Sequence, residues 1–244
     1  MWILSLFVWT VTLSGMAKAQ SLRDYMFGGH SPEEHRGELP DVALFKSNMG
    51  KEFVFDNSQG RPLVRFDNSD EVFALSATRG TKGDVIFKND IGEPVLKATR
   101  WGGLILFNDD NPGGDAVSIE GKARSIVSQH LSPAQLFQSL VHASSRASKA
   151  AMRLIEFNAS DVSPQSDYIY ADAANITADA MSEIAKRNNG QKLLEPIKSV
   201  AMIEGRPPSV TIKSGVLLLK IDSTASYAGR PSSKKVMLTI TLGH

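Results

Sequence analysis

The apolar positions divide this chain into a region of short strands and a region with helical spacing. From about Lys46 to Gly121, short apolar or β-branched runs alternate with clusters of Gly, Pro, Asn and Asp, which is typical of strands joined by tight turns. From Ser125 to Asn189, apolar residues recur at the three- and four-residue spacing of a helix. Strand-like runs then return. The pattern predicts a mixed α+β protein.

One three-strand unit occurs twice in the strand region. The segment FVFDNSQGRPLVRF, residues 53–66, aligns with VIFKNDIGEPVLKA, residues 85–98, at an offset of 32, and the strands predicted at 72–75 and 104–107 keep that register. We expect an antiparallel β-meander of six or seven strands, and the sequence leaves open whether it closes into a barrel. Four turn or strand residues are identical in both copies: Phe55/Phe87, Asn57/Asn89, Gly60/Gly92 and Pro62/Pro94.

A short phrase, an aromatic residue followed by an Asn/Asp cluster, marks the ends of several predicted strands. Asn and Asp tolerate left-handed backbone and bond their own main chain, so each phrase predicts a strand that enters a turn. The phrase occurs four times, beginning at Phe55, Phe66, Phe87 and Phe107.

The second half is predicted to hold two helices and more strands. Ser132-Pro133-Ala134-Gln135 is a capping box with proline at the first helical position. A second helix is predicted from about Ser166 to Lys186, and the loop 158–165 favours an antiparallel helical hairpin. Ser214-Gly215 predicts a β-hairpin, and residues 235–242 alternate as a final strand.

The first residues are typical of an export signal. Met1 to Ala19 reads MWILSLFVWTVTLSGMAKA, an apolar run followed by Ala-x-Ala, with no basic residue before the run. The run is shorter than the roughly 20 residues that span a bilayer. We expect cleavage after Ala19, a periplasmic or secreted location, and no integral membrane span afterwards; an uncleaved anchor or a buried N-terminal element is the alternative. The expected organisation is a signal peptide (1–19), a lead-in segment (20–45), a β-meander domain (46–124) and an α+β domain (125–244).

Composition narrows the function classes further. The chain has no cysteine, which excludes disulfides, a zinc ribbon and a thiol nucleophile. Its 27 basic and 26 acidic residues argue against general nucleic-acid binding. Residues 20–124 hold 13 basic and 17 acidic residues, and residues 125–244 hold 13 and 9. This imbalance predicts contact between the two halves rather than attraction to a polyanion.

Metal sites are not indicated by the sequence. His30 and His35 lie five residues apart without a zinc-protease motif, and exposure to solvent is the simpler interpretation. The oxygen-rich segment from Asn108 to Asp115 resembles a calcium loop, but its twelfth position is Ile119 rather than an acid. A polar turn between two strands is the better interpretation, and no metal or cofactor is expected.

Catalytic motifs are equally absent. Ser232-Ser233-Lys234-Lys235 matches S-x-x-K and Lys213-Ser214-Gly215 resembles K-T-G, but their order along the chain is the reverse of that in penicillin-recognising enzymes. Neither phosphate-binding glycine motif occurs. We therefore assign no catalytic residue, although carboxylates from distant parts of the chain remain an open alternative.

Two segments are candidates for ligand or partner binding. Lys97, Arg100 and Trp101 stand beside a glycine pair, where an indole ring and two cations suit a sugar or a peptide; a tryptophan packed over the end of the β region is the alternative. Arg230 lies in one of three Gly-Arg-Pro tripeptides, where a rigid turn presents a guanidinium to a carboxylate partner or simply serves as a turn.

Two segments also carry a family resemblance. GDVIFKNDIGEPVLKATRWGG, residues 83–103, and AGRPSS, residues 228–233, resemble a family of exported alphaproteobacterial proteins of unknown function. The resemblance implies a Gram-negative envelope location but no activity, substrate or catalytic residue.

The leading hypothesis is a non-enzymatic, exported protein that binds an envelope protein or glycan. The alternatives are a hydrolase of an envelope polymer with dispersed carboxylates, and a structural homo-oligomer formed through exposed β edges. The oligomeric state is not indicated by the sequence.

Overall fold

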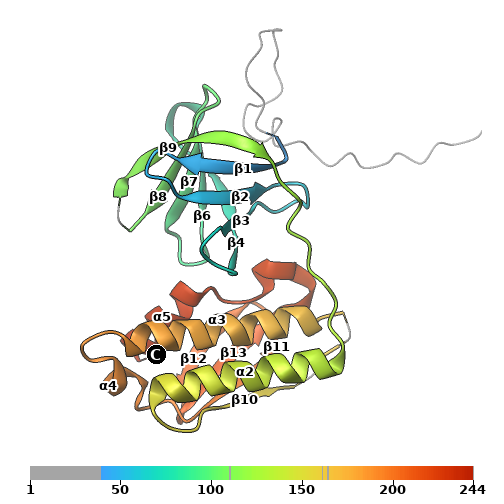
Figure 1. The fold of residues 1–244 in the computed structure, drawn as a ribbon, viewed down its shortest axis with the longest axis vertical. Helices are drawn as coiled ribbons and strands as arrows, with labels where there is room; N and C mark the ends of the chain where they lie inside the picture. Colours follow the sequence, from blue (N-terminus) through green and yellow to red (C-terminus); the bar gives the residue numbers. More distant parts are fainter. Residues whose placement is uncertain (1–39, 110, 161, 164, 244) are drawn as a thin grey trace, which may run out of the picture.

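The computed structural model describes residues 40–243 except residues 110, 161 and 164. The predicted export signal, most of the predicted lead-in segment, and both His30 and His35 lie outside the described residues. The described chain forms two units that pack on each other, one made of strands and one of helices on a smaller sheet (Figure 1). The mixed α+β class is therefore confirmed.

The first unit is a nine-stranded antiparallel sheet. Its spatial order is β4-β3-β2-β1-β9-β8-β7-β6-β5, so the two edge strands are neighbours in sequence. Only Leu75, which is fully buried, separates β4 from β5. A single residue can join opposite edges only if the sheet is rolled so that they meet. We call this unit the rolled sheet; its strands are β1 (Val42–Ser47), β2 (Glu52–Asp56), β3 (Leu63–Phe66), β4 (Val72–Ala74), β5 (Ser76–Arg79), β6 (Val85–Lys88), β7 (Pro94–Ala98), β8 (Leu104–Asn108) and β9 (Asn111–Lys122), with a 3-10 turn at Thr81–Gly83.

The repeated three-strand unit is confirmed as β2-β3-β4 and β6-β7-β8. The repeat-equivalent Phe55 and Phe87 are both fully buried, and their ring centroids lie 5.4 Å apart at 64°. A residue that meets its own equivalent indicates an approximate two-fold relation between the copies. The expected six or seven strands are too few, because β1 begins within the predicted lead-in segment and β5 and β9 complete the sheet.

Apolar side chains alternate into the interior of the rolled sheet. β1 shows this alternation along its whole length, with Ala43 and Phe45 buried. Phe45 stacks on Phe53 with centroids 5.5 Å apart. The interior is therefore packed with aromatic and aliphatic side chains.

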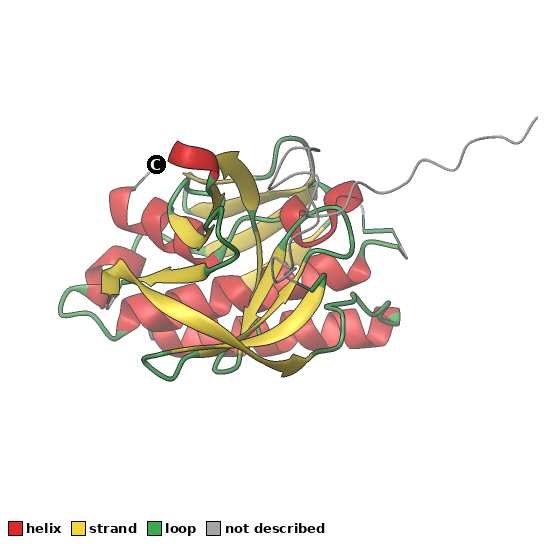
Figure 2. Ribbon diagram, turned by 90° about the horizontal axis from the view of Figure 1, so that it is seen from above, coloured by secondary structure: helices red, strands yellow, loops and turns green. Residues whose placement is uncertain are grey.

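The second unit places helices over a four-stranded sheet of order β10-β11-β13-β12. Figure 2 shows the strands of the rolled sheet above the long helices. The buried positions of α3 include those of the predicted apolar stripe, from Ile169 to Ile184. The elements are α2 (Pro133–Ala151), β10 (Glu156–Ala159), α3 (Asp167–Ala185), α4 (Gly190–Leu194), β11 (Ser199–Glu204), β12 (Ser209–Lys213), β13 (Val216–Ile221), a 3-10 segment at Ser223–Gly229 and α5 (Ser233–Leu242).

The predicted antiparallel relation of the two long helices is wrong. Strand β10 returns the chain between them, so α2 and α3 run in the same direction (Figure 1). Arg146 accordingly pairs with Asp179 at 2.6 Å, and both residues lie in the C-terminal half of their helix. The prediction failed because β10 is too short to show an alternating pattern, and it pairs in parallel with β11, far along the chain.

The predicted final strand at residues 235–242 is a helix, α5. Its β-branched residues alternate like a strand, but Val236, Thr239 and Ile240 are the buried positions, at helical spacing. Ser232 caps the helix by accepting a hydrogen bond from the Lys235 N–H at 3.1 Å. The predicted hairpin at Ser214-Gly215 is confirmed, and both turn residues have positive φ.

Candidate functional site

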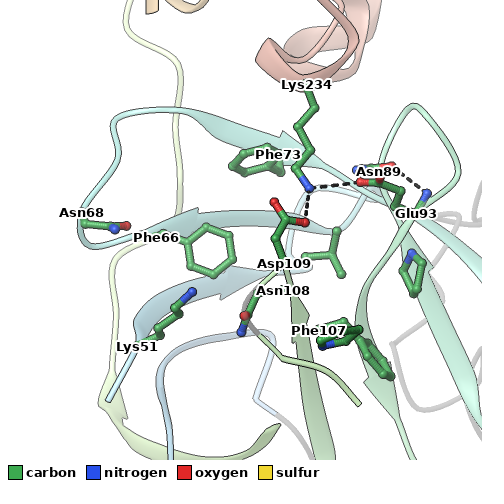
Figure 3. Close-up of a pocket in the computed structure, with 13 residues that line it drawn as sticks. Lys51, Phe66, Asn68, Phe73, Asn89, Glu93, Phe107, Asn108, Asp109 and Lys234 are labelled. Carbon is green, nitrogen blue, oxygen red and sulfur yellow. Dashed lines mark hydrogen bonds and ion pairs between the residues drawn. The ribbon is translucent and has the colours of Figure 1, made fainter. Parts of the chain in front are cut away.

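A cavity of about 610 Å³ opens where four turns of the rolled sheet meet α5 (Figure 3). This volume lies in the range of small-molecule sites. The turns are those between β1 and β2, β3 and β4, β6 and β7, and β8 and β9, all at one end of the sheet. The apolar lining consists of Phe66, Phe73, Pro94, Val95, Phe107 and Pro112.

The floor of the cavity comes from strand ends. Phe66 ends β3, and Phe107 is the next-to-last residue of β8, so both precede the polar turns predicted from the aromatic-Asn/Asp phrase. Phe66 and Phe73 meet edge to face, with centroids 6.0 Å apart and an interplanar angle of 74°. The floor is therefore an angular aromatic notch rather than a flat platform.

One side of the rim is an ionic bridge. The Lys234 Nζ lies 3.1 Å from Glu93 Oε2 and 2.9 Å from Asp109 Oδ1 (Figure 3). Partial burial lowers the pKa of Lys234, but hydrogen bonds and charge from both carboxylates outweigh it and raise the pKa overall. The ammonium therefore stays protonated. Asn89 orients Glu93 by donating from Nδ2 to its Oε2 at 3.1 Å. Lys51 lies on the opposite side of the cavity.

Helix α5 is held in place by carboxylates of the rolled sheet. Asp90 accepts a hydrogen bond from the Ser232 N–H at 2.9 Å, and Glu71 accepts one from the Ser233 N–H at 2.9 Å. Free N–H groups at a helix start favour negative charge, so both contacts stabilise the docked helix. They fix Lys234, in the first turn of α5, over the cavity.

Arg230 joins the two units through a buried ionic network. Its Nε donates to Asp172 on α3 at 2.5 Å, its Nη1 lies 3.5 Å from Glu71 Oε1, and its Nη2 donates to the Val72 carbonyl at 2.9 Å. Burial raises the pKa of Glu71, and the charge of Asp172, which shares the same guanidinium, adds to that rise. The ion pairs between units match the opposite charge imbalance of the two halves.

Three of the predicted binding residues lie together in the β7–β8 region. The Arg100 guanidinium carbon is 4.1 Å from the ring centroid of Trp101, a cation–π contact, and the indole is 74% exposed. Trp101 does not pack over the end of the sheet. Lys97 pairs with Asp84 at 3.1 Å, and Asp84 also accepts the Arg100 N–H at 3.1 Å. These contacts lower the pKa of Asp84, with the Arg100 hydrogen bond as the largest cause.

The fourth predicted residue, Arg230, does not join this group. It is only 4% exposed, and the carboxylates that it binds belong to the same chain. Trp101 lies at the other end of β7 from Pro94 and the cavity, so the structure separates the two surfaces by the length of that strand.

The rejected motifs have structural roles. The segment containing Asn108 and Asp109 is the polar turn between β8 and β9, and Asp109 binds Lys234. Ser232 of the S-x-x-K match is a helix cap. In the part of the chain that the structure describes, no group of three or more His, Asp or Glu side chains is arranged to hold a metal ion.

Sequence reasoning did not identify the cavity. A usable signal was present, because three of the four aromatic-Asn/Asp phrases, those beginning at Phe66, Phe87 and Phe107, supply turns at its rim. The sequence did not show that these turns come together. It also did not show that Lys234, which lies 125 residues after Asp109 in the chain, binds Asp109 at the rim.

The fold and cavity define an α+β protein of two packed units with a small-molecule-sized cavity at their junction. A family model described as a domain of unknown function, DUF4908, matches residues 21–240, and the chain belongs to this family. No curated protein and no solved structure matches the chain. Among the described residues, none of the helices combines the length and apolar character needed to cross a bilayer.

Proposed function

We propose that this protein is an exported, non-enzymatic binding protein of the bacterial envelope that holds a small amphipathic molecule in the cavity beside α5. The cavity carries the proposal, because it combines an aromatic floor with a charged rim. The apolar segment at residues 1–19 and the resemblance to exported alphaproteobacterial proteins support the envelope location.

A blocking substitution tests this function. Asn68 is exposed at the cavity rim, and Asn68→Trp places a large ring over the opening; Asp67→Trp, on the neighbouring exposed residue that does not line the cavity, is the matched control. Both proteins are incubated with a small-molecule extract of envelopes, and bound compounds are identified by native mass spectrometry. We expect capture by wild type and Asp67→Trp and at least a tenfold loss in Asn68→Trp. Equal capture by all three proteins contradicts the proposal.

The exposed Trp101 surface is proposed as a second contact, for a macromolecular partner. It consists of Lys97, Arg100 and Trp101, and its support is the exposed indole with a guanidinium stacked on it. Crosslinking and pull-down from envelopes, with Trp101→Ala as control, tests this surface. If the Trp101→Ala variant captures a specific partner as well as wild type does, the Trp101 surface is not the contact.

A hydrolase remains the second candidate because of one observation. Glu93 Oε2 and Asp109 Oδ1 bind the same ammonium at 3.1 and 2.9 Å, so these oxygens lie at most about 6 Å apart, a limit that admits the roughly 5–5.5 Å spacing of retaining glycosidases. The shared lysine and the 83% exposure of the Asp109 side chain weigh against a protonated general acid. Degradation of envelope polymer by wild type but not by Glu93→Gln would favour the hydrolase.

A further inference from the structure

The interior beneath the cavity limits the size of its occupant. Phe66 stands against Phe53, with centroids 5.7 Å apart, and Phe53 and Phe55 are fully buried. Aromatic rings therefore close the floor, and a long acyl chain has no channel to enter. The apolar part of the ligand therefore lies in the notch that Phe66 and Phe73 form.

The shape of the floor argues against a sugar. A pyranose ring stacks on a flat aromatic face, whereas Phe66 and Phe73 meet at 74° and form a notch. An aliphatic or phenyl group fits such a notch, because it contacts one ring face and one ring edge together.

The rim carries both signs of charge on opposite sides. On one side, two carboxylates, Glu93 and Asp109, share one lysine, Lys234, so among the described residues of this ionic bridge acidic groups outnumber basic ones. Lys51 faces this group across the cavity (Figure 3). An ammonium group has three donors, so Lys51 can hold a ligand oxygen in addition to its present contacts. A purely anionic or purely cationic ligand satisfies only one of these sides.

We propose that the occupant is a small zwitterion with an apolar side chain, namely a free apolar amino acid or a short apolar peptide. Its ammonium group lies against Glu93 and Asp109, its carboxylate against Lys51, and its side chain in the phenylalanine notch. This inference rests on the proposed binding function and names the ligand class for the same cavity.

Calorimetry on the full chain tests the ligand class. The probes are L-phenylalanine, L-leucine and the dipeptide leucyl-phenylalanine, compared with 3-phenylpropanoate, which lacks the ammonium, phenethylamine, which lacks the carboxylate, and glucose. We expect at least one zwitterion to bind about tenfold or more tightly than either single-charge analogue. Comparison of the amino acids with the dipeptide distinguishes the two sources. Failure of every zwitterion to bind, or equal binding of an analogue, overturns the inference.

Paired rim variants separate the two charge contacts. Asp109→Asn is conservative at an 83% exposed side chain, so it leaves the fold intact, and it is expected to weaken zwitterion and phenethylamine binding while leaving 3-phenylpropanoate unchanged. Lys51→Met is expected to weaken zwitterion and 3-phenylpropanoate binding while leaving phenethylamine binding unchanged. Equal losses for all probes in both variants overturn the assignment of charges.

The two proposals fail in different ways. If a non-zwitterionic compound is captured and Asn68→Trp abolishes its binding, the binding function stands and the zwitterion inference falls. If Asn68→Trp changes nothing for any captured compound, the cavity function itself falls.

Discussion

The first copy of the repeated unit, β2–β4, and the second, β6–β8, share their buried residues but differ in what their turns contact. Phe55 and Phe87 occupy equivalent positions and touch each other at the centre of the rolled sheet. The fully buried Asp56 of the first copy corresponds to Lys88 of the second, which is half-buried on β6.

Asp56 holds the connection to the second unit. It accepts hydrogen bonds from the Ser125 hydroxyl at 2.5 Å, the Ile126 N–H at 2.6 Å and the Ser58 N–H at 2.8 Å. Burial raises its pKa, but these hydrogen bonds outweigh burial and lower the pKa overall.

The later turns of the two copies differ as well. Glu71, which binds α5, corresponds to Gly103, and Ser69 corresponds to the exposed Trp101. The comparison shows that the two copies keep their inward positions and several residues of their first turn, whereas their later turns differ. Both copies contact α5, through Glu71 in the first and through Asp90 and Glu93 in the second, but the later turn of the second copy leaves Trp101 exposed.

The largest expected loss of stability follows from a substitution at the junction between the units. Arg230→Ala leaves Glu71 and Asp172 without their shared guanidinium, and removal of one partner of a buried ion pair costs about 3–5 kcal/mol. Urea unfolding measures this loss. Arg61→Ala, in the exposed Gly-Arg-Pro of the first copy, is the control and should change stability by less than about 0.5 kcal/mol. Equal effects of the two variants would contradict the role given to Arg230.

A smaller effect distinguishes equivalent positions of the two copies. Asp56→Ala removes the acceptor of the Ser125 and Ile126 hydrogen bonds and should cost about 1–3 kcal/mol. Lys88→Ala should cost less than about 0.5 kcal/mol. Thermal or urea unfolding of both variants checks the difference, and a loss in Lys88→Ala as large as that in Asp56→Ala would show that the copies are not specialised in this way.

The two buried carboxylates should respond to pH with opposite sign. Burial raises the pKa of Glu71 above its usual 4.5, so its contribution to stability is full below that value and is lost as the pH rises through the folded-state pKa. The pKa of Asp56 is lowered overall, so its contribution is present above its usual 3.8 and is lost as the pH falls through the folded-state pKa. Unfolding free energies between pH 3 and 8 should show that Glu71→Gln removes the first dependence and Asp56→Asn the second. Slopes of the same sign for the two carboxylates would contradict this.

The smallest stability effect is expected at Trp101. The indole is 74% exposed, so Trp101→Ala should change the unfolding free energy by no more than about 0.5 kcal/mol. The same variant should lose partner capture in the envelope pull-down, while Ser69→Ala, at the equivalent position of the first copy, should keep it. A large stability loss would mean that the indole packs on the protein in solution.

The sequence predicted the elements whose signals are local. The capping box at Ser132 marked the start of α2, and Ser214-Gly215 marked the β12–β13 turn, because both depend on neighbouring residues alone. The repeat located six strands through turn residues that recur at a fixed offset.

Elements that depend on distant partners were missed. Strand β10 is only four residues long and pairs in parallel with β11, and the start of α5 is docked on carboxylates of the rolled sheet that accept the Ser232 and Ser233 N–H groups. The cavity is the extreme case, since its floor, rim and bridging lysine come from five separate segments. The sequence marked three of its turns as strand ends, through the phrases beginning at Phe66, Phe87 and Phe107, but gave no sign that they meet.

Lys234 stands in the second unit although every other residue of the cavity belongs to the first. It follows Asp109 by 125 residues, so a chain emerging from the ribosome exposes the aromatic notch long before the lysine that closes it. The rim of the cavity is therefore complete only after the whole chain has been made and α5 has docked on the rolled sheet.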